Sequence, residues 1–149
     1  MKKTIFYLVA IFASTLFYQC SKTDDKVAVG GYDVVSYFKS ETPVKGSETF
    51  TTDLNGKTYY FSNEESLKEF TSDPDKYVPQ YGGYCAYAVA EKKIKMGVDP
   101  EVYEIRDGKL YLFYNSFFAN KLKDWQEGDT KALQVKGDKN WEEIKNLDK

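Results

Sequence analysis

The fold is decided by residues 56–88, which read GKTYYFSNEESLKEFTSDPDKYVPQYGGYCAYA. Together with the preceding Asn55, the first glycine of this stretch supplies the pair of residues that a tight hairpin turn prefers. Ser62, with an acidic residue three positions later, predicts a capped helix from about Asn63 to Thr71. The Asp-Pro pair that follows ends this helix, because a proline disfavours the helical conformation of the residue before it.

A second hairpin signal, Asp107-Gly108, lies inside the segment VYEIRDGKLYLFY. Residues 116–125 predict an amphipathic helix whose apolar side chains are Phe117, Phe118, Leu122 and Trp125. A last polar helix is expected at 130–133 and again at 140–147, and we find no internal repeat of useful length. These elements predict an α+β fold, one small domain with two β-hairpins and several short helices.

The chain contains no histidine, the side chain that most often transfers protons near neutral pH. This absence excludes Ser-His and Cys-His nucleophile pairs, HExxH zinc sites and facial triads that contain histidine. With only two cysteines, Cys20 and Cys85, a cysteine-rich structural zinc site within one chain is excluded too. Carboxylate, tyrosine, lysine or lone-thiol chemistry stays open, and a non-enzymatic role is favoured.

The N-terminus has the features of an export signal. Two lysines open residues 1–19, and an uncharged, mostly apolar run follows that is shorter than the roughly 20 residues needed to span a bilayer. Cys20 lies where a lipoprotein signal places its acylated cysteine. We therefore expect a signal peptide at 1–19, a polar tether at 20–28 after a lipidated Cys20, and a domain at 29–147, anchored in the periplasm or cell envelope.

Charge bears on the class of partner. Removing residues 1–19 takes away two lysines and no acidic residue, which changes the formal charge from −2 to −4. Acidic and basic residues are interspersed, so no basic face for nucleic acid is indicated. We expect a small-molecule or protein partner, no nucleic acid, and contact with the membrane only through the lipid anchor.

Several segments together resemble the YHS domain, a small module of metal-handling proteins related to treble-clef metal-binding domains. They are GKTYYFSNEESLKEFTSDPDKY, YGGYCAYAVA, DGKLYLFYN and GDKNW, and the longer pattern is similar to exported bacterial proteins that contain this domain. The resemblance implies a YHS or treble-clef-related fold. Metal-binding members carry cysteines at the positions that match Ser36, Ser62 and Ser66 here. Serine is a weak metal ligand, so we expect these positions to be vestigial, with no metal and no cofactor.

The candidate ligand-binding residues are Tyr81, Tyr84, Cys85 and Tyr87. Flanking aromatic residues favour burial of Cys85 in a core, although the first turn of a helix would favour a reactive thiolate there. The leading hypothesis is an extracytoplasmic, lipid-anchored binding module with an aromatic site near these tyrosines. The alternatives are a protein that handles copper or zinc through Cys85 and a thiol-based redox protein.

Overall fold

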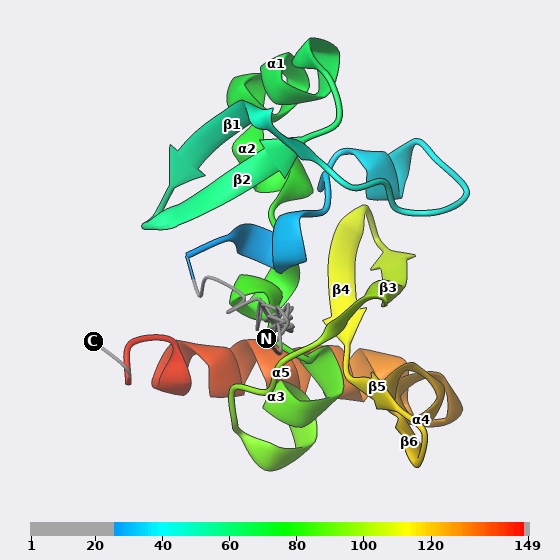
Figure 1. Cartoon of the computed structure of the whole chain (residues 1–149). Helices are drawn as coiled ribbons and strands as arrows, with labels where there is room; N and C mark the ends of the chain where they lie inside the picture. Colours follow the sequence, from blue (N-terminus) through cyan, green and yellow to red (C-terminus); the bar gives the residue numbers. More distant parts are fainter. Residues whose placement is uncertain (1–25, 148–149) are drawn as a thin grey trace, which may run out of the picture.

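Two β-hairpins and a set of short helices make up the computed structural model, which describes residues 26–147 (Figure 1). The first hairpin pairs β1 (Ser47–Leu54) with β2 (Lys57–Phe61), and the second pairs β3 (Asp99–Arg106) with β4 (Lys109–Phe113). Both turns use the predicted residues in left-handed backbone conformations. The prediction of a small α+β domain with these hairpins is confirmed.

The remaining elements are short. The helices are α1 (Glu64–Ser72), α2 (Pro74–Tyr77), α3 (Ala86–Lys92), α4 (Lys121–Glu127) and α5 (Thr130–Ile144). Single 3-10 turns are η1 (Ala28–Gly31), η2 (Ser36–Phe38) and η3 (Gln80–Gly83). A small third hairpin joins β5 (Asn115–Ser116) to β6 (Ala119–Asn120). Among the described residues, no helix is long and apolar enough to cross a membrane.

Three local predictions were wrong. The cap of α1 is Asn63, whose side chain accepts from the Ser66 amide, because Ser62 is engaged elsewhere. The C-terminal region forms one continuous helix, α5, rather than two. The segment predicted as a helix from Ser116 begins with the β5–β6 hairpin, and the helix starts only at Lys121.

The expected boundary of the tether also differs from the folded region. Val27 forms a bridge with Thr58, and the carbonyl of Lys26 accepts from the Thr58 amide. Ala28 is buried in the first hydrophobic cluster. Within the described residues, ordered contacts to the domain therefore begin before residue 29. The predicted signal peptide and Cys20 lie outside the described residues, so those two predictions stay predictions.

The two long hairpins have the same strand register and the same bulge. In the register of β1–β2, Ser47 pairs with Phe61 and a bulge precedes the next pair; in β3–β4, Asp99 pairs with Phe113 and a bulge follows at the same place. Each paired position in the second hairpin lies 52 residues after its counterpart (99 − 47 = 52). The structure thus contains an internal repeat, so the prediction that the chain has no repeat of useful length was wrong.

The repeat extends upstream of the hairpins. Val29, Gly30 and Gly31 have φ values of 49°, 59° and 81°, and the residues 52 positions later, at 81–83, have values of 53°, 61° and 83°. Each of these two segments therefore has three consecutive residues in the left-handed conformation, and the last two are glycines, which adopt it at little cost. We call residues 27–78 unit 1 and residues 79–145 unit 2. Identical residues occur at Gly30/Gly82, Gly31/Gly83, Tyr32/Tyr84, Gly56/Gly108, Lys57/Lys109, Tyr59/Tyr111, Phe61/Phe113 and Asn63/Asn115.

Each unit packs one aromatic side chain from its helix onto two rings of its hairpin. In unit 1, Phe70 of α1 lies 4.8 Å from the ring of Tyr59 and 5.1 Å from that of Phe61. In unit 2, Trp125 of α4 lies 5.6 Å from each of the equivalent rings, Tyr111 and Phe113. The two hydrophobic clusters are therefore built in the same way.

The units meet where η2 of unit 1 packs on the second hairpin. The hydroxyl of Tyr37 donates to the carbonyl of Pro100 at 2.7 Å, and its ring packs edge-on against Tyr103. Leu110 and Leu112 of β4 complete this buried junction. On the other side, the β1–β2 turn and α5 are separated by a cleft.

Candidate ligand-binding cleft

A cavity of about 690 Å³ lies between the β1–β2 turn of unit 1 and α5 of unit 2. Its floor is the connection between the units, from Val78 through η3 to Tyr84. Its walls are residues of the hairpin turns and of α5: Leu54, Asn55, Lys57, Tyr59, Lys109, Asp138, Trp141, Glu142 and Lys145. A cavity of this size suits a small molecule. We call it the inter-unit cleft.

The aromatic part of the inter-unit cleft consists of Tyr81, Tyr84 and Trp141. The ring of Trp141 lies 6.2 Å from that of Tyr84 and 6.3 Å from that of Tyr81. A β-carbon on Gly82 would come within 3.0 Å of the Trp141 ring, so the glycine lets α5 approach η3 this closely. Tyr84 and Trp141 are only partly buried and offer ring surface to a ligand.

Lysine side chains surround these rings. The ammonium group of Lys57 lies 5.9 Å from the Tyr84 ring, and that of Lys95 lies 5.9 Å from the same ring and 6.0 Å from Trp141. Four lysines line the cleft against three carboxylates: Lys57, Lys95, Lys109 and Lys145 against Asp75, Asp138 and Glu142. One of those carboxylates, Glu142, is already paired with Lys145. The cleft is thus more positive than the chain as a whole, which has a formal charge of −2.

Tyr81 fixes the position of α5. Its hydroxyl donates to Asp138 at 3.0 Å and approaches the carbonyl of Gln134 at 3.3 Å. Burial, and then the charge and hydrogen bond of Asp138, raise the pKa of Tyr81 well above its ordinary value. The phenol therefore keeps its proton and remains a donor, which holds Asp138 at the edge of the cleft.

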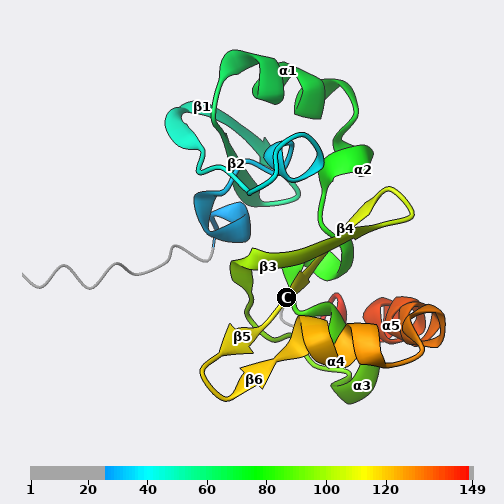
Figure 2. The same cartoon turned by 90° about the vertical axis from the view of Figure 1, so that its right-hand side faces the viewer.

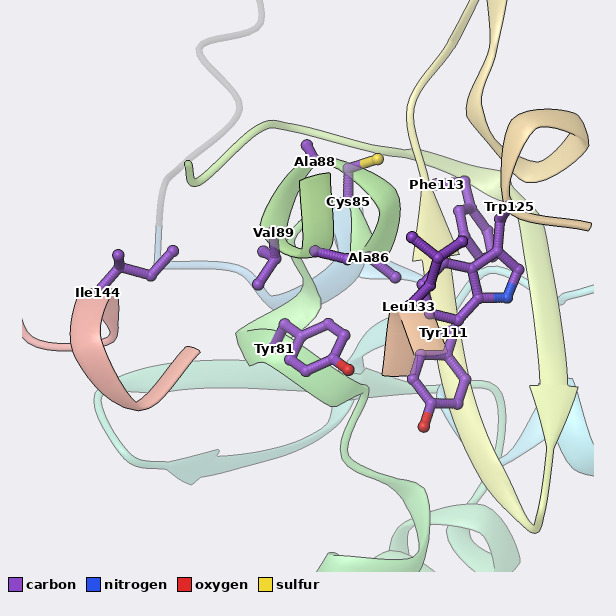
Figure 3. Close-up of a cluster of buried hydrophobic side chains, with 11 residues drawn as sticks. Tyr81, Cys85, Ala86, Ala88, Val89, Tyr111, Phe113, Trp125, Leu133 and Ile144 are labelled. Atoms are coloured by element: carbon purple, nitrogen blue, oxygen red, sulfur yellow. The ribbon is translucent and has the colours of Figure 1, made fainter. Parts of the chain in front are cut away.

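The other two candidate residues lie elsewhere. Tyr87 lines a smaller hollow between α3 and the start of α5. Cys85, the residue before α3, has no exposed surface and lies in the cluster with Phe113 and Trp125 (Figure 3). Of the four residues selected from the sequence, the cleft brings together Tyr81 and Tyr84. Sequence reasoning missed Trp141 and the lysines, because they come from segments far apart in the chain.

The three serines at the expected vestigial positions surround one hollow of about 260 Å³, together with Lys39, Glu65 and neighbouring residues. Ser36 and Ser62 are tied to the buried Asp33. The Ser36 hydroxyl donates to the Asp33 carbonyl at 2.6 Å, and the Ser62 hydroxyl donates to the Asp33 carboxylate at 2.7 Å. The Val35 and Ser62 amides donate to the same carboxylate. These polar groups therefore satisfy one another.

The serine hollow belongs to the part of the chain that a family comparison matches. The family model of the YHS domain matches residues 35–81. The chain contains a YHS domain. The match covers most of unit 1 and ends at Tyr81, just inside unit 2. No match to the chain was found among curated proteins or among solved structures.

The internal repeat shows which residue of the YHS domain is equivalent to Cys85. Cys85 in unit 2 is the counterpart of Asp33 in unit 1, and both side chains are fully buried. The amide of each donates to an equivalent carbonyl, that of Met96 for Cys85 and that of Val44 for Asp33. Within residues 26–147, no three histidine, cysteine, aspartate or glutamate side chains gather as a metal ion would need. Cys85 thus has the surroundings of a core residue.

Proposed function

We propose that this protein is an extracytoplasmic, lipid-anchored binding module whose ligand site is the inter-unit cleft. One observation carries the proposal: partly exposed rings of Tyr84 and Trp141 stand beside the ammonium groups of Lys57 and Lys95. Ring surface favours a planar molecule, and the ammonium groups favour a negative charge on it. The ligand class that fits is a small planar organic anion.

The YHS domain contributes one wall of this site and unit 2 contributes the other. Leu54, Asn55, Lys57 and Tyr59 come from the first hairpin, and Asp138 and Trp141 come from α5. Because both units line the cleft, the site depends on the pairing of the units. This role needs neither a metal nor a reactive thiol.

Calorimetric titration with 4-hydroxybenzoate as the probe tests the ligand class. We expect micromolar to millimolar binding, about 10-fold weaker binding of the neutral analogue 4-hydroxybenzamide, and about 10-fold weaker binding of the acid to Lys95→Gln. Trp141→Ala is expected to weaken the binding of the acid at least as much, because it removes the ring on which the ligand would stack. Thermal unfolding of each variant checks that it remains folded.

Tyr87→Ala is the matched control, because Tyr87 is an aromatic residue outside the cleft. It should leave the dissociation constant of the acid unchanged. Equal affinity for the acid and the amide, or equal losses in Tyr87→Ala and Trp141→Ala, would contradict the proposed site.

The lipid anchor rests on the sequence around Cys20, which follows the short apolar run of the export signal. Mass spectrometry of the mature N-terminus should show a diacylglyceryl group on Cys20. A mature chain that begins at another residue, or a retained Met1, would refute the anchor while leaving the cleft unaffected.

A further inference from the structure

Two phenylalanines project into solvent from the turn between β5 and β6. Phe117 is 95% exposed and Phe118 is 92% exposed, and their rings pack edge to face with centroids 5.0 Å apart. Every other large apolar residue on the exposed surface of residues 26–147 is less exposed than these two. Isolated exposed apolar residues are ordinary, but an adjacent pair at the end of a projection marks a contact site. We call residues 116–119 the Phe tip.

The fold does not require the Phe tip. In unit 1 the chain passes from β2 to Asn63, whose side chain caps α1 by accepting from the Ser66 amide. In unit 2 the residue that caps α4 in the same way is Asn120, which accepts from the Lys123 amide. The β5–β6 hairpin is thus an insertion between equivalent elements of the two units, and its aromatic rings contribute nothing to either hydrophobic cluster.

Few charges lie next to the Phe tip, apart from the Asp99 carboxylate, which accepts from the Asn115 side chain at 3.2 Å. The sequence from Leu110 to Asn120, LYLFYNSFFAN, contains no charged residue. The lysines that follow are paired within α4, Lys121 with Asp124 and Lys123 with Glu127. Apolar rings above a collar of asparagine and serine match the transition from acyl chains to headgroups.

The position of the Phe tip also fits a membrane. In Figure 2 the start of the described chain, in blue, and the β5–β6 hairpin both lie toward the left, whereas Figure 1 shows them apart across the width of the molecule. Cys20 precedes Lys26 by six residues, which reach at most about 20 Å when extended. A lipid on Cys20 would therefore hold the bilayer close to the side on which the Phe tip projects.

We propose that the Phe tip inserts into the interfacial layer of a lipid bilayer and orients the anchored protein on it. The Phe tip is narrow and convex, so it offers little contact area to a rigid protein partner. Lipid is deformable and can surround both rings. The proposal adds a second membrane contact to the proposed anchor at Cys20. It leaves the inter-unit cleft, which is lined by other elements, accessible from solvent.

Spin-label accessibility on the full chain tests this inference. The chain is purified from cell membranes and reconstituted into vesicles of phosphatidylethanolamine and phosphatidylglycerol, with a nitroxide on Ser116→Cys in a Cys85→Ser background. The accessibility of this label to a water-soluble nickel chelate should be at least about 5-fold lower than that of a label on Asn55→Cys, in the turn of the first hairpin. Phe117→Ser/Phe118→Ser should abolish this shielding.

Two results would overturn the inference. One is a Ser116→Cys label as open to nickel as the Asn55→Cys label in vesicles. The other is a label that is open in vesicles but immobilised in native envelope membranes, which would assign the Phe tip to a protein partner. The mass of the N-terminus is measured on the same sample, so a failed anchor and a failed tip are distinguished.

Discussion

Replacing Trp125 with alanine is expected to lower the free energy of unfolding by about 4 kcal/mol. The indole has no exposed surface and packs on Tyr111 and Phe113, so its removal leaves a large cavity between α4 and the second hairpin. It also removes the hydrogen bond from the indole nitrogen to Glu104 at 3.3 Å. Chemical denaturation monitored by circular dichroism measures the loss.

Phe70→Ala is the matched variant in unit 1, because Phe70 holds the equivalent place on Tyr59 and Phe61. A loss of about 3–4 kcal/mol is expected there. If the two units are equivalent in construction, both substitutions belong among the most destabilising in the protein. A loss below about 1 kcal/mol at either position would contradict the equivalence.

Asp33→Ala is expected to cost about 3 kcal/mol, although it removes only a small side chain. The carboxylate is fully buried and accepts from the amides of Val35 and Ser62 and from the Ser62 hydroxyl. Alanine would leave the buried Val35 amide and the half-buried Ser62 donors without this acceptor, and a buried donor left unsatisfied costs about 1–3 kcal/mol. The free energy of unfolding, measured in urea, gives the result.

The counterpart of Asp33 provides the control. Cys85→Ala removes a buried sulfur from the equivalent position in unit 2, and the side chain there contributes packing rather than polar contacts. Its expected cost is about 1–2 kcal/mol. An Asp33→Ala variant as stable as the Cys85→Ala variant would show that the Asp33 network does not support the YHS domain.

The predictions from the sequence that were confirmed depend on local signals. Asn55-Gly56 and Asp107-Gly108 each determine a hairpin, because few residues adopt left-handed conformations at low cost. The capping signal at Ser62 predicted the helix α1 correctly, although the residue that caps the helix is Asn63. In these places the chain needs only near neighbours to form the structure.

The internal repeat and the Phe tip were not predictable in this way. The repeat preserves backbone conformation and register at a spacing of 52 residues. Its signal in the sequence is a set of scattered identical pairs, such as Gly30/Gly82 and Tyr59/Tyr111, among positions that mostly differ. The spacing of Phe117, Phe118 and Trp125 suits one face of a helix. A helix prediction from this spacing assumes that all three side chains are buried. The structure instead exposes the first two and buries the third.

The inter-unit cleft could be predicted only in part. The glycine-flanked tyrosines of η3 pointed to Tyr81 and Tyr84, but Trp141 reaches them from α5, almost 60 residues later in the chain. Lys57 comes from the first hairpin on the opposite side of the cleft. A site made by two units depends on their packing, which no local pattern in one sequence records.

The most direct test of the central claim is the location of the bound probe, measured from chemical-shift changes in the ¹H–¹⁵N spectrum during titration with 4-hydroxybenzoate. The account predicts that the largest changes occur at Gly82, Tyr84, Lys95 and the indole N–H of Trp141, with little change around Tyr87. Changes that concentrate around Tyr87 and Leu133, or an unchanged spectrum at millimolar probe, would contradict a ligand site between the units.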